Sequence, residues 1–194
     1  LQKKLGVKGF RLPPVDLDEN GAALPGFRFP RWLQCPSCNR LKTAEKWDRR
    51  TGNPARWCAD CTAKYNRSTY VVPARFVTAC ANGHLDEFPW LYWFRSKPEN
   101  RELCKDERAC ALKFTSSESM GLSGLAVVCE TCGGHKGMGD IFAKGAVRNK
   151  CTGYRPWLKD NREECTEEMR VLQRGASNLY IPIEESALSI PPWS

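Results

Sequence analysis

The chain has 194 residues, which suffices for one domain or two small ones, and it carries eleven cysteines, two histidines and a formal net charge of +8. No stretch approaches the roughly 18 apolar residues of a transmembrane helix, and the N-terminal residues 1–5 lack the apolar core of a secretory signal. An odd number of cysteines fits a complete disulfide framework poorly, whereas closely spaced pairs are typical of metal sites. Because the first residue is not methionine, we expect an excerpt of a longer protein.

Residues 1–30 are rich in Gly and Pro and predict an extended lead-in. Residues 31–69 contain Cys35-Pro36-Ser37-Cys38 and, nineteen residues later, Cys58-Ala59-Asp60-Cys61. A two-residue spacer lets one tight turn direct both sulfurs at one ion, and two such turns complete a closed tetrahedron. Buried free thiols or a redox pair are the alternatives. The spacing favours a zinc ribbon, in which two knuckles are joined by polar hairpin-like segments, with four ligands: Cys35, Cys38, Cys58 and Cys61.

Residues 70–194 predict a second zinc-binding domain with mixed, loop-rich structure, whose kind of partner only the resemblance described below implies. Residues 70–79 are β-branched and apolar enough for a strand, and Pro73 places that strand at a sheet edge. Residues 84–95 predict a helix whose aromatic side chains pack in the core, and further strands are predicted at 111–115, 124–129, 169–173 and 179–183. The fold class is therefore small α+β and zinc-stabilised, an N-terminal zinc ribbon followed by this mixed domain.

The second domain contains another knuckle, Cys129-Glu130-Thr131-Cys132, which is followed by two glycines. Elimination groups it with two single cysteines in a second site: Cys129, Cys132, Cys151 and Cys165. The residues that remain form a third tetrahedral set: Cys80, His84, Cys104 and Cys110. The alternative for His84 is a hydrogen-bonded structural histidine, and His135 is interpreted as a loop residue. The sequence thus predicts two to three Zn²⁺ ions.

Positive charge is concentrated around the first cysteine set. Zinc binds thiolates, so three sites would lower the net charge from +8 to about +3. Residues 1–75 nevertheless carry fifteen Lys and Arg against six Asp and Glu. The residues predicted to contact DNA phosphates are Arg40, Lys42, Lys46, Arg49, Arg50, Arg56, Lys64 and Arg67. Aromatic residues lie between them and could stack on bases. The alternatives are a solvated basic face and aromatics that fill the small core of the ribbon.

The stretch from Arg75 to Trp90, with Cys80-Ala81-Asn82-Gly83-His84 at its centre, resembles a signature of the DrmB family. Members are helicase-associated subunits of the DISARM anti-phage defence system, and the wider family includes the zinc-binding domain of MrfA-type DNA-repair helicases. Further stretches agree: Cys151–Leu158, Arg174–Tyr180 and Ser186–Trp193. The resemblance implies a bacterial cytoplasmic protein that works beside a superfamily 2 helicase, DrmA, on foreign DNA. It also maps the family's four-cysteine zinc motif onto Cys129, Cys132, Cys151 and Cys165.

Enzymatic function is disfavoured by the residues that the chain offers. Gly133–Gly137 lacks the spacing and the hydroxyl of a phosphate-binding loop. Metal-dependent hydrolysis requires an open coordination position, and a RING ligase requires interleaved ligand pairs. The predicted function is a noncatalytic zinc-binding accessory module of a DNA helicase complex in anti-phage defence, which docks the helicase and contributes to DNA binding. The alternative is a pure protein–protein interaction scaffold without DNA contacts of its own.

Overall fold

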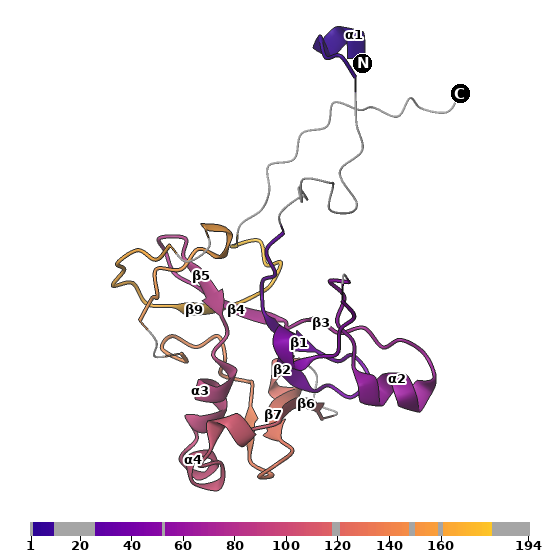
Figure 1. Ribbon diagram of the computed structural model, residues 1–194. Coiled ribbons are helices and arrows are strands. Elements are labelled where there is room, and N and C mark those ends of the chain that lie inside the picture. Colours follow the sequence, from indigo (N-terminus) through magenta and orange to yellow (C-terminus); the bar gives the residue numbers. More distant parts are fainter. Residues whose placement is uncertain are drawn as a thin grey trace, which may run out of the picture.

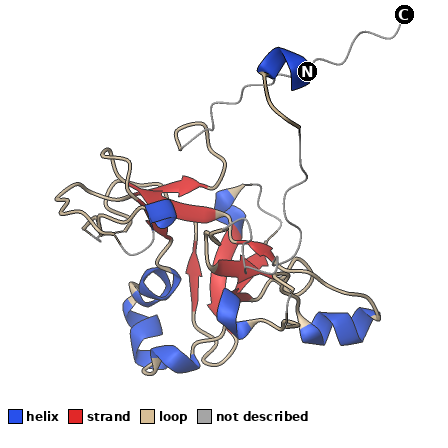
Figure 2. Cartoon of the chain, turned by 45° about the horizontal axis from the view of Figure 1, so that its top comes forward, coloured by secondary structure: helices blue, strands red, loops and turns tan. Residues whose placement is uncertain are grey.

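The computed structural model describes residues 2–9, 26–51, 53–117, 121–147, 150–158 and 161–179. These residues form short helices and three antiparallel sheets (Figures 1 and 2). The helices are α1 (Gln2–Leu5), α2 (Ala59–Tyr65), α3 (Trp90–Arg95) and α4 (Pro98–Leu103). The strands are β1 (Trp32–Gln34), β2 (Leu41–Thr43), β3 (Val72–Pro73), β4 (Phe76–Ala79), β5 (Leu85–Glu87), β6 (Leu112–Ser116), β7 (Leu125–Cys129), β8 (His135–Gly137) and β9 (Arg170–Gln173). None of the helices in these ranges has the length and hydropathy that crossing a membrane requires.

The ribbon is built on a sheet with strand order β2-β1-β3. Strands β1 and β2 form a hairpin that encloses the first cysteine pair, and β3 lies at the edge, where Pro73 predicts it. The second knuckle leads directly into a helix that was not predicted, because Cys58 precedes α2 and Cys61 lies in its first turn. Asn66 ends that helix with a left-handed backbone, φ 49°. Asparagine tolerates this conformation well.

The strand predicted at 70–79 is divided between two sheets. Its first part is β3 in the ribbon, and its second part is β4, the central strand of a sheet with order β5-β4-β9. Residues 170–173 form β9, which confirms the strand predicted at 169–173, and Ala79 faces Arg170 across the β4–β9 pair. Figure 1 shows β9 beside β4, so a strand near the end of the described residues pairs with one from the middle of the sequence. The strand predicted at 179–183 lies outside the described residues after position 179.

The helix predicted at 84–95 begins later than expected. Residues 85–87 form β5, which pairs with β4, and helix α3 starts only at Trp90. The reason is Pro89, since a proline disfavours helical backbone at the preceding residue. Phe88 therefore stays outside the helix. This correction leaves His84 in a turn between two strands, a position from which a side chain can reach a neighbouring loop.

Strands β6, β7 and β8 form the third sheet, and its first two members confirm the strands predicted at 111–115 and 124–129. This sheet joins the ribbon directly. Arg40 forms a β-bridge with Lys113, and the backbone N–H of Phe114 donates to the carbonyl of Asn39 at 2.9 Å. Backbone hydrogen bonding therefore joins the ribbon to the third sheet at this point.

The main core lies where α3 packs against the sheets. Phe88, Trp90 and Phe94 are fully buried, and the rings of Phe88 and Trp90 lie 4.5 Å apart in an edge-on arrangement. The expected core role of the aromatic cluster is confirmed for these residues, whereas Tyr92 is 40% exposed. In the ribbon the buried tryptophan is Trp47, which fills a small core together with cysteine side chains. This observation favours the packing interpretation of that aromatic residue.

Asn100 is a buried polar residue that ties three elements together. It is 1% exposed, and its Nδ2 atom donates to the carbonyl of Phe94 at 2.9 Å and to that of His135 at 3.0 Å. It also lies against Gly134, where an added Cβ atom would approach its Oδ1 to 2.7 Å. The amide of Asn100 thereby fixes α3, α4 and the knuckle before β8 relative to one another.

We predict that Asn100→Ala lowers the free energy of unfolding by about 2 kcal/mol or more, because the carbonyls of Phe94 and His135 both lose a hydrogen-bond donor. Urea denaturation measures the change. Asn161→Ala is the matched control, since Asn161 is exposed and exposed substitutions usually change stability by less than about 0.5 kcal/mol. Equal stability of the two variants would contradict the structural role of Asn100.

Candidate metal centres

The first cysteine set converges as its spacing predicts. The four sulfurs of Cys35, Cys38, Cys58 and Cys61 all lie within 4.8 Å of one another. Two of the sulfur–sulfur distances are 3.7 Å, between Cys35 and Cys61, and 3.9 Å, between Cys38 and Cys58. A tetrahedron with metal–sulfur bonds of about 2.3 Å has an edge of about 3.8 Å. The geometry therefore fits one tetrahedrally coordinated metal ion.

The first knuckle also stabilises negative charge on sulfur. The backbone N–H groups of Ser37 and Cys38 point at the Cys35 sulfur, at 3.4 and 3.5 Å. Burial opposes ionisation of Cys35, but these N–H groups outweigh it and the pKa of its thiol is lowered. Burial dominates at Cys61 and raises the pKa of that thiol to about 12. Metal binding to this set must therefore displace a tightly held proton.

A second set combines residues from distant parts of the chain. The Sγ atoms of Cys80 and Cys151 each lie 3.4 Å from the Nδ1 atom of His84 and 3.6 Å from each other. Cys165 completes the group, whose ligand atoms all lie within 4.8 Å of one another. A sulfur–nitrogen edge in a tetrahedral zinc site is about 3.6 Å. The set fits one ion held by three thiolates and one imidazole.

Glu163 orients His84 in this set. The imidazole is almost fully buried, and its Nε2 atom lies 3.1 Å from the Oε2 atom of Glu163. Arg155 holds the other side of the carboxylate, with Nε 3.1 Å from Oε1, and hydrogen bonds from Arg155 and then His84 lower the pKa of Glu163. A carboxylate on Nε2 places the proton there and leaves Nδ1 free to bind metal. The cysteine spacing does not predict this role of Glu163. Its one sequence signal is that Glu163 lies two residues before Cys165.

Gly153 allows the segment that carries Cys151 to lie against the segment that carries Cys165. Its φ is +64°, and its N–H donates to the Cys151 sulfur at 3.3 Å. A Cβ atom at this position would lie 1.6 Å from the carbonyl oxygen of Glu163. Only glycine allows this close approach, so the residue is required for Glu163 and Cys165 to reach the site.

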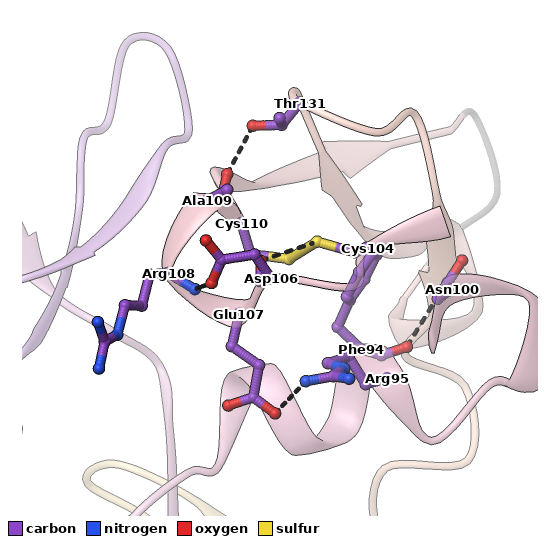
Figure 3. The surroundings of a disulfide bond; sticks show 10 residues. All are labelled: Phe94, Arg95, Asn100, Cys104, Asp106, Glu107, Arg108, Ala109, Cys110 and Thr131. Atoms are coloured by element: carbon purple, nitrogen blue, oxygen red, sulfur yellow. Dashed lines mark hydrogen bonds and ion pairs between the residues drawn. A yellow bond between two sulfur atoms is a disulfide. The ribbon is translucent and has the colours of Figure 1, made fainter. Parts of the chain in front are cut away.

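The third set lies around the knuckle at the end of β7. The ligand atoms of Cys104, Cys110 and Cys129 lie within 4.8 Å of one another, and a disulfide joins Cys104 to Cys110, with Cα atoms 6.7 Å apart (Figure 3). Thr131 donates its hydroxyl to the carbonyl of Ala109 at 2.8 Å and so holds the knuckle against the Cys110 segment. The Cys132 side chain interacts with Cys129: backbone N–H groups and this interaction outweigh burial and lower the pKa of Cys129, whereas burial raises that of Cys132.

The structure corrects the grouping of ligands outside the ribbon. Cys151 and Cys165 meet Cys80 and His84 rather than the knuckle at 129–132, and the two cysteines at 104 and 110 lie beside that knuckle. The reason is the pairing of β4 with β9, which brings the segment before β9 to the turn that follows β4. Single cysteines contain no information about this long-range pairing. All twelve predicted ligands still lie in or beside one of the three sets.

Two of the eight predicted DNA-binding residues make ion pairs or hydrogen bonds with other parts of the protein through their side chains. Arg40 forms ion pairs with Asp60 and with Glu130, the latter at 2.7 Å between Nε and Oε2. Arg56 donates to backbone carbonyls, among them that of Ala44 at 3.2 Å. The other six have no carboxylate oxygen within 4.0 Å among the residues that the structure covers: Lys42, Lys46, Arg49, Arg50, Lys64 and Arg67.

The grouping predicts how zinc content responds to paired substitutions. Cys80→Ser with Cys151→Ser should lose one equivalent of zinc, because both ligands serve the same ion. Cys129→Ser with Cys151→Ser should lose two, because these ligands serve different ions. Elemental analysis of purified, reduced protein measures both. If the first pair lost two equivalents and the second pair one, the grouping from the structure would be wrong.

The orientation of His84 predicts an effect of its carboxylate partner. Glu163→Ala should weaken zinc binding at the second set by about 10–100-fold, the usual effect of removing a carboxylate behind a ligating histidine. Competition with a chromogenic chelator measures the affinity. Glu164→Ala, at the exposed neighbouring position, is the control. Equal zinc affinity in both variants would show that Glu163 does not orient the ligand.

Comparison with known proteins agrees with the sequence resemblance. Residues 1–181 match the family described as a domain of unknown function, DUF8724. The chain is also 34% identical, over 175 residues, to the DISARM protein DrmB of Bacillus paralicheniformis. That alignment covers 87% of this chain and 29% of the relative, so the chain spans less than a third of the length of that protein. The predicted resemblance to DrmB is thereby confirmed, and the chain belongs to the DUF8724 family.

Proposed function

We propose that the chain is a noncatalytic zinc-binding accessory module of a DNA helicase complex in anti-phage defence. It docks a superfamily 2 helicase subunit of the DrmA type in the bacterial cytoplasm and contributes to DNA binding. The observation that carries the defence role is the similarity to a DISARM protein over most of the chain. The contribution to DNA binding is supported by the unpaired cations on the ribbon.

The three ligand sets each suit one Zn²⁺ ion. The ribbon set supplies four thiolates and the second set three thiolates and the Nδ1 atom of His84. The third ion requires Cys104 and Cys110 as thiols, which two-electron reduction of their disulfide by a cellular thiol provides, together with Cys129 and Cys132. Four protein ligands leave no open coordination position, so these ions would stabilise the fold rather than catalyse a reaction.

The unpaired cations lie on segments that the first cysteine set holds together. Arg49 and Arg50 lie between the two cysteine pairs, and the guanidinium of Arg50 lies 5.7 Å from the centre of the Trp57 ring. Lys64 lies 5.3 Å from the centre of the Tyr65 ring, and Tyr65 is 47% exposed. Cations without carboxylate partners attract phosphate, and exposed aromatic rings beside them can contact bases. A metal ion bound to the first cysteine set would fix the segments that carry these groups.

We predict that Arg49→Glu with Arg50→Glu weakens DNA binding similarly across DNA sequences. The slope of log affinity against log salt should become shallower by about two, one for each lost phosphate contact. Fluorescence anisotropy at several salt concentrations measures both quantities, and a thermal melt checks that the variant is folded. Arg101→Glu with Lys144→Glu, outside the ribbon, is the matched control. An equal loss in the control would place the main contact elsewhere.

The second candidate function is an interaction scaffold without DNA contacts of its own. Exposed apolar side chains on the ribbon favour it, since Tyr70 is 56% and Val72 45% exposed at the β3 edge. A chain that binds no DNA at low salt but retains the helicase subunit in a pull-down from its host would support this candidate. The same pull-down tests helicase docking, because recovery of the chain without a helicase subunit would contradict both candidates.

A further inference from the structure

A cavity of about 440 Å³ lies between the ribbon and the third sheet. Its apolar wall contains Trp32 from β1, Leu41 from β2 and Leu112 from β6. Cavities of 300–1,000 Å³ are typical of sites for small organic groups. Trp32 is half-buried, and its ring lies 6.5 Å from that of Trp90, so the core supports it from behind while it lines the cavity. The cavity therefore offers an aromatic surface in a fixed position.

The two sides of this cavity are fastened to each other. Glu130 accepts from Arg40 at 2.7 Å and lies 3.4 Å from the Nζ atom of Lys113. The β-bridge between Arg40 and Lys113 links the same two elements through the backbone. Cys110, a member of the third metal set, lies in the cavity wall. The cavity thus lies between the ribbon and the third sheet, each of which carries candidate metal ligands. It is present before any ligand binds.

The charges at the cavity favour an anion. Lys42, Lys46 and Arg108 line it, and within the described ranges none of the three has a carboxylate oxygen within 4.0 Å. The two acidic residues of the lining are already paired, Glu107 with Arg95 and Glu130 with Arg40. Figure 3 shows the Arg108 side chain directed away from the disulfide. A ligand here meets an apolar aromatic wall and uncompensated positive charge together.

We propose that this cavity binds an unstacked base of single-stranded DNA, with the flanking phosphates held by Lys42, Lys46 and Arg108. The inference deepens the proposed DNA-binding role and rests on it. A base presents an aromatic face to Trp32 and carries a phosphate on either side, which matches the wall and the cations. In a duplex the bases are stacked and paired, so their faces cannot enter the cavity. The preferred substrate is therefore a single strand.

The test compares two oligonucleotides of equal length and charge with the whole reduced, zinc-loaded chain. One is a thymidine 12-mer, and the other has abasic units in its central part. Fluorescence anisotropy should show about 10-fold weaker binding of the abasic strand, as expected when one base–aromatic stack is lost. A duplex of the same length should also bind more weakly than the intact single strand.

A protein variant connects the base preference to this cavity. Trp32→Ala risks unfolding, since Trp32 packs on the core. Ala111→Leu instead adds bulk at an exposed position of the lining. Ala111→Leu should abolish the difference in affinity between the intact and the abasic strand, while the salt dependence of binding remains. Ala63→Leu, on the exposed surface of α2, is the matched control and should keep the difference.

The outcomes separate this proposal from the proposed function. Equal binding of the intact and abasic strands would overturn the base site but leave phosphate binding by the ribbon intact. Absence of binding by both strands would overturn DNA binding itself. If Ala111→Leu left the base preference unchanged and instead reduced recovery of the helicase subunit, the cavity would be a protein dock and the base site would be wrong.

Discussion

The convergence of cysteine sulfurs from distant segments is the constraint on which the rest of this structure depends. The ribbon set joins the β1–β2 hairpin to α2, the second joins the turn after β4 to the loop before β9, and the third joins the end of α4 to the end of β7. The regular elements between these points are short, and a two- or three-residue strand has little stability alone. Four bonds to one ion would fix such segments more strongly than their small apolar contacts can.

The sequence predicted best what depends on local spacing. Two Cys-x-x-Cys pairs defined the ribbon set completely, and β6, β7 and β9 lie at the strands predicted at 111–115, 124–129 and 169–173. The grouping of Cys151 and Cys165 could not be predicted, because it follows from the pairing of β4 with β9 across 90 residues of chain. The turn at His84 was missed for a different reason: the aromatic run after it suggested a helix, and Pro89 delays the start of that helix.

The basic cluster shows why charge in a sequence does not translate directly into a binding surface. Arg40 and Arg56 serve the fold, one in ion pairs to two elements and the other in hydrogen bonds to backbone carbonyls. The remaining six cations have no carboxylate oxygen within 4.0 Å among the described residues, so they are better candidates for contacts outside the chain. Glu130, the acidic residue that lines the same cavity as Lys42 and Lys46, is paired with Arg40 and Lys113. Zinc bound to the four thiolates of the first set would add negative charge to the ribbon and would lower the local net positive charge.

The zinc content of the chain decides whether the cysteine sets are metal sites. Three closed sites predict three equivalents of zinc per chain, by elemental analysis of protein that was purified under reducing conditions and never exposed to chelator. Stepwise removal with a strong chelator should then unfold the chain, because each ion holds segments that are distant in sequence. One equivalent or fewer in such protein, or a chain that stays folded without metal, would contradict the claim that these cysteine sets are structural zinc sites.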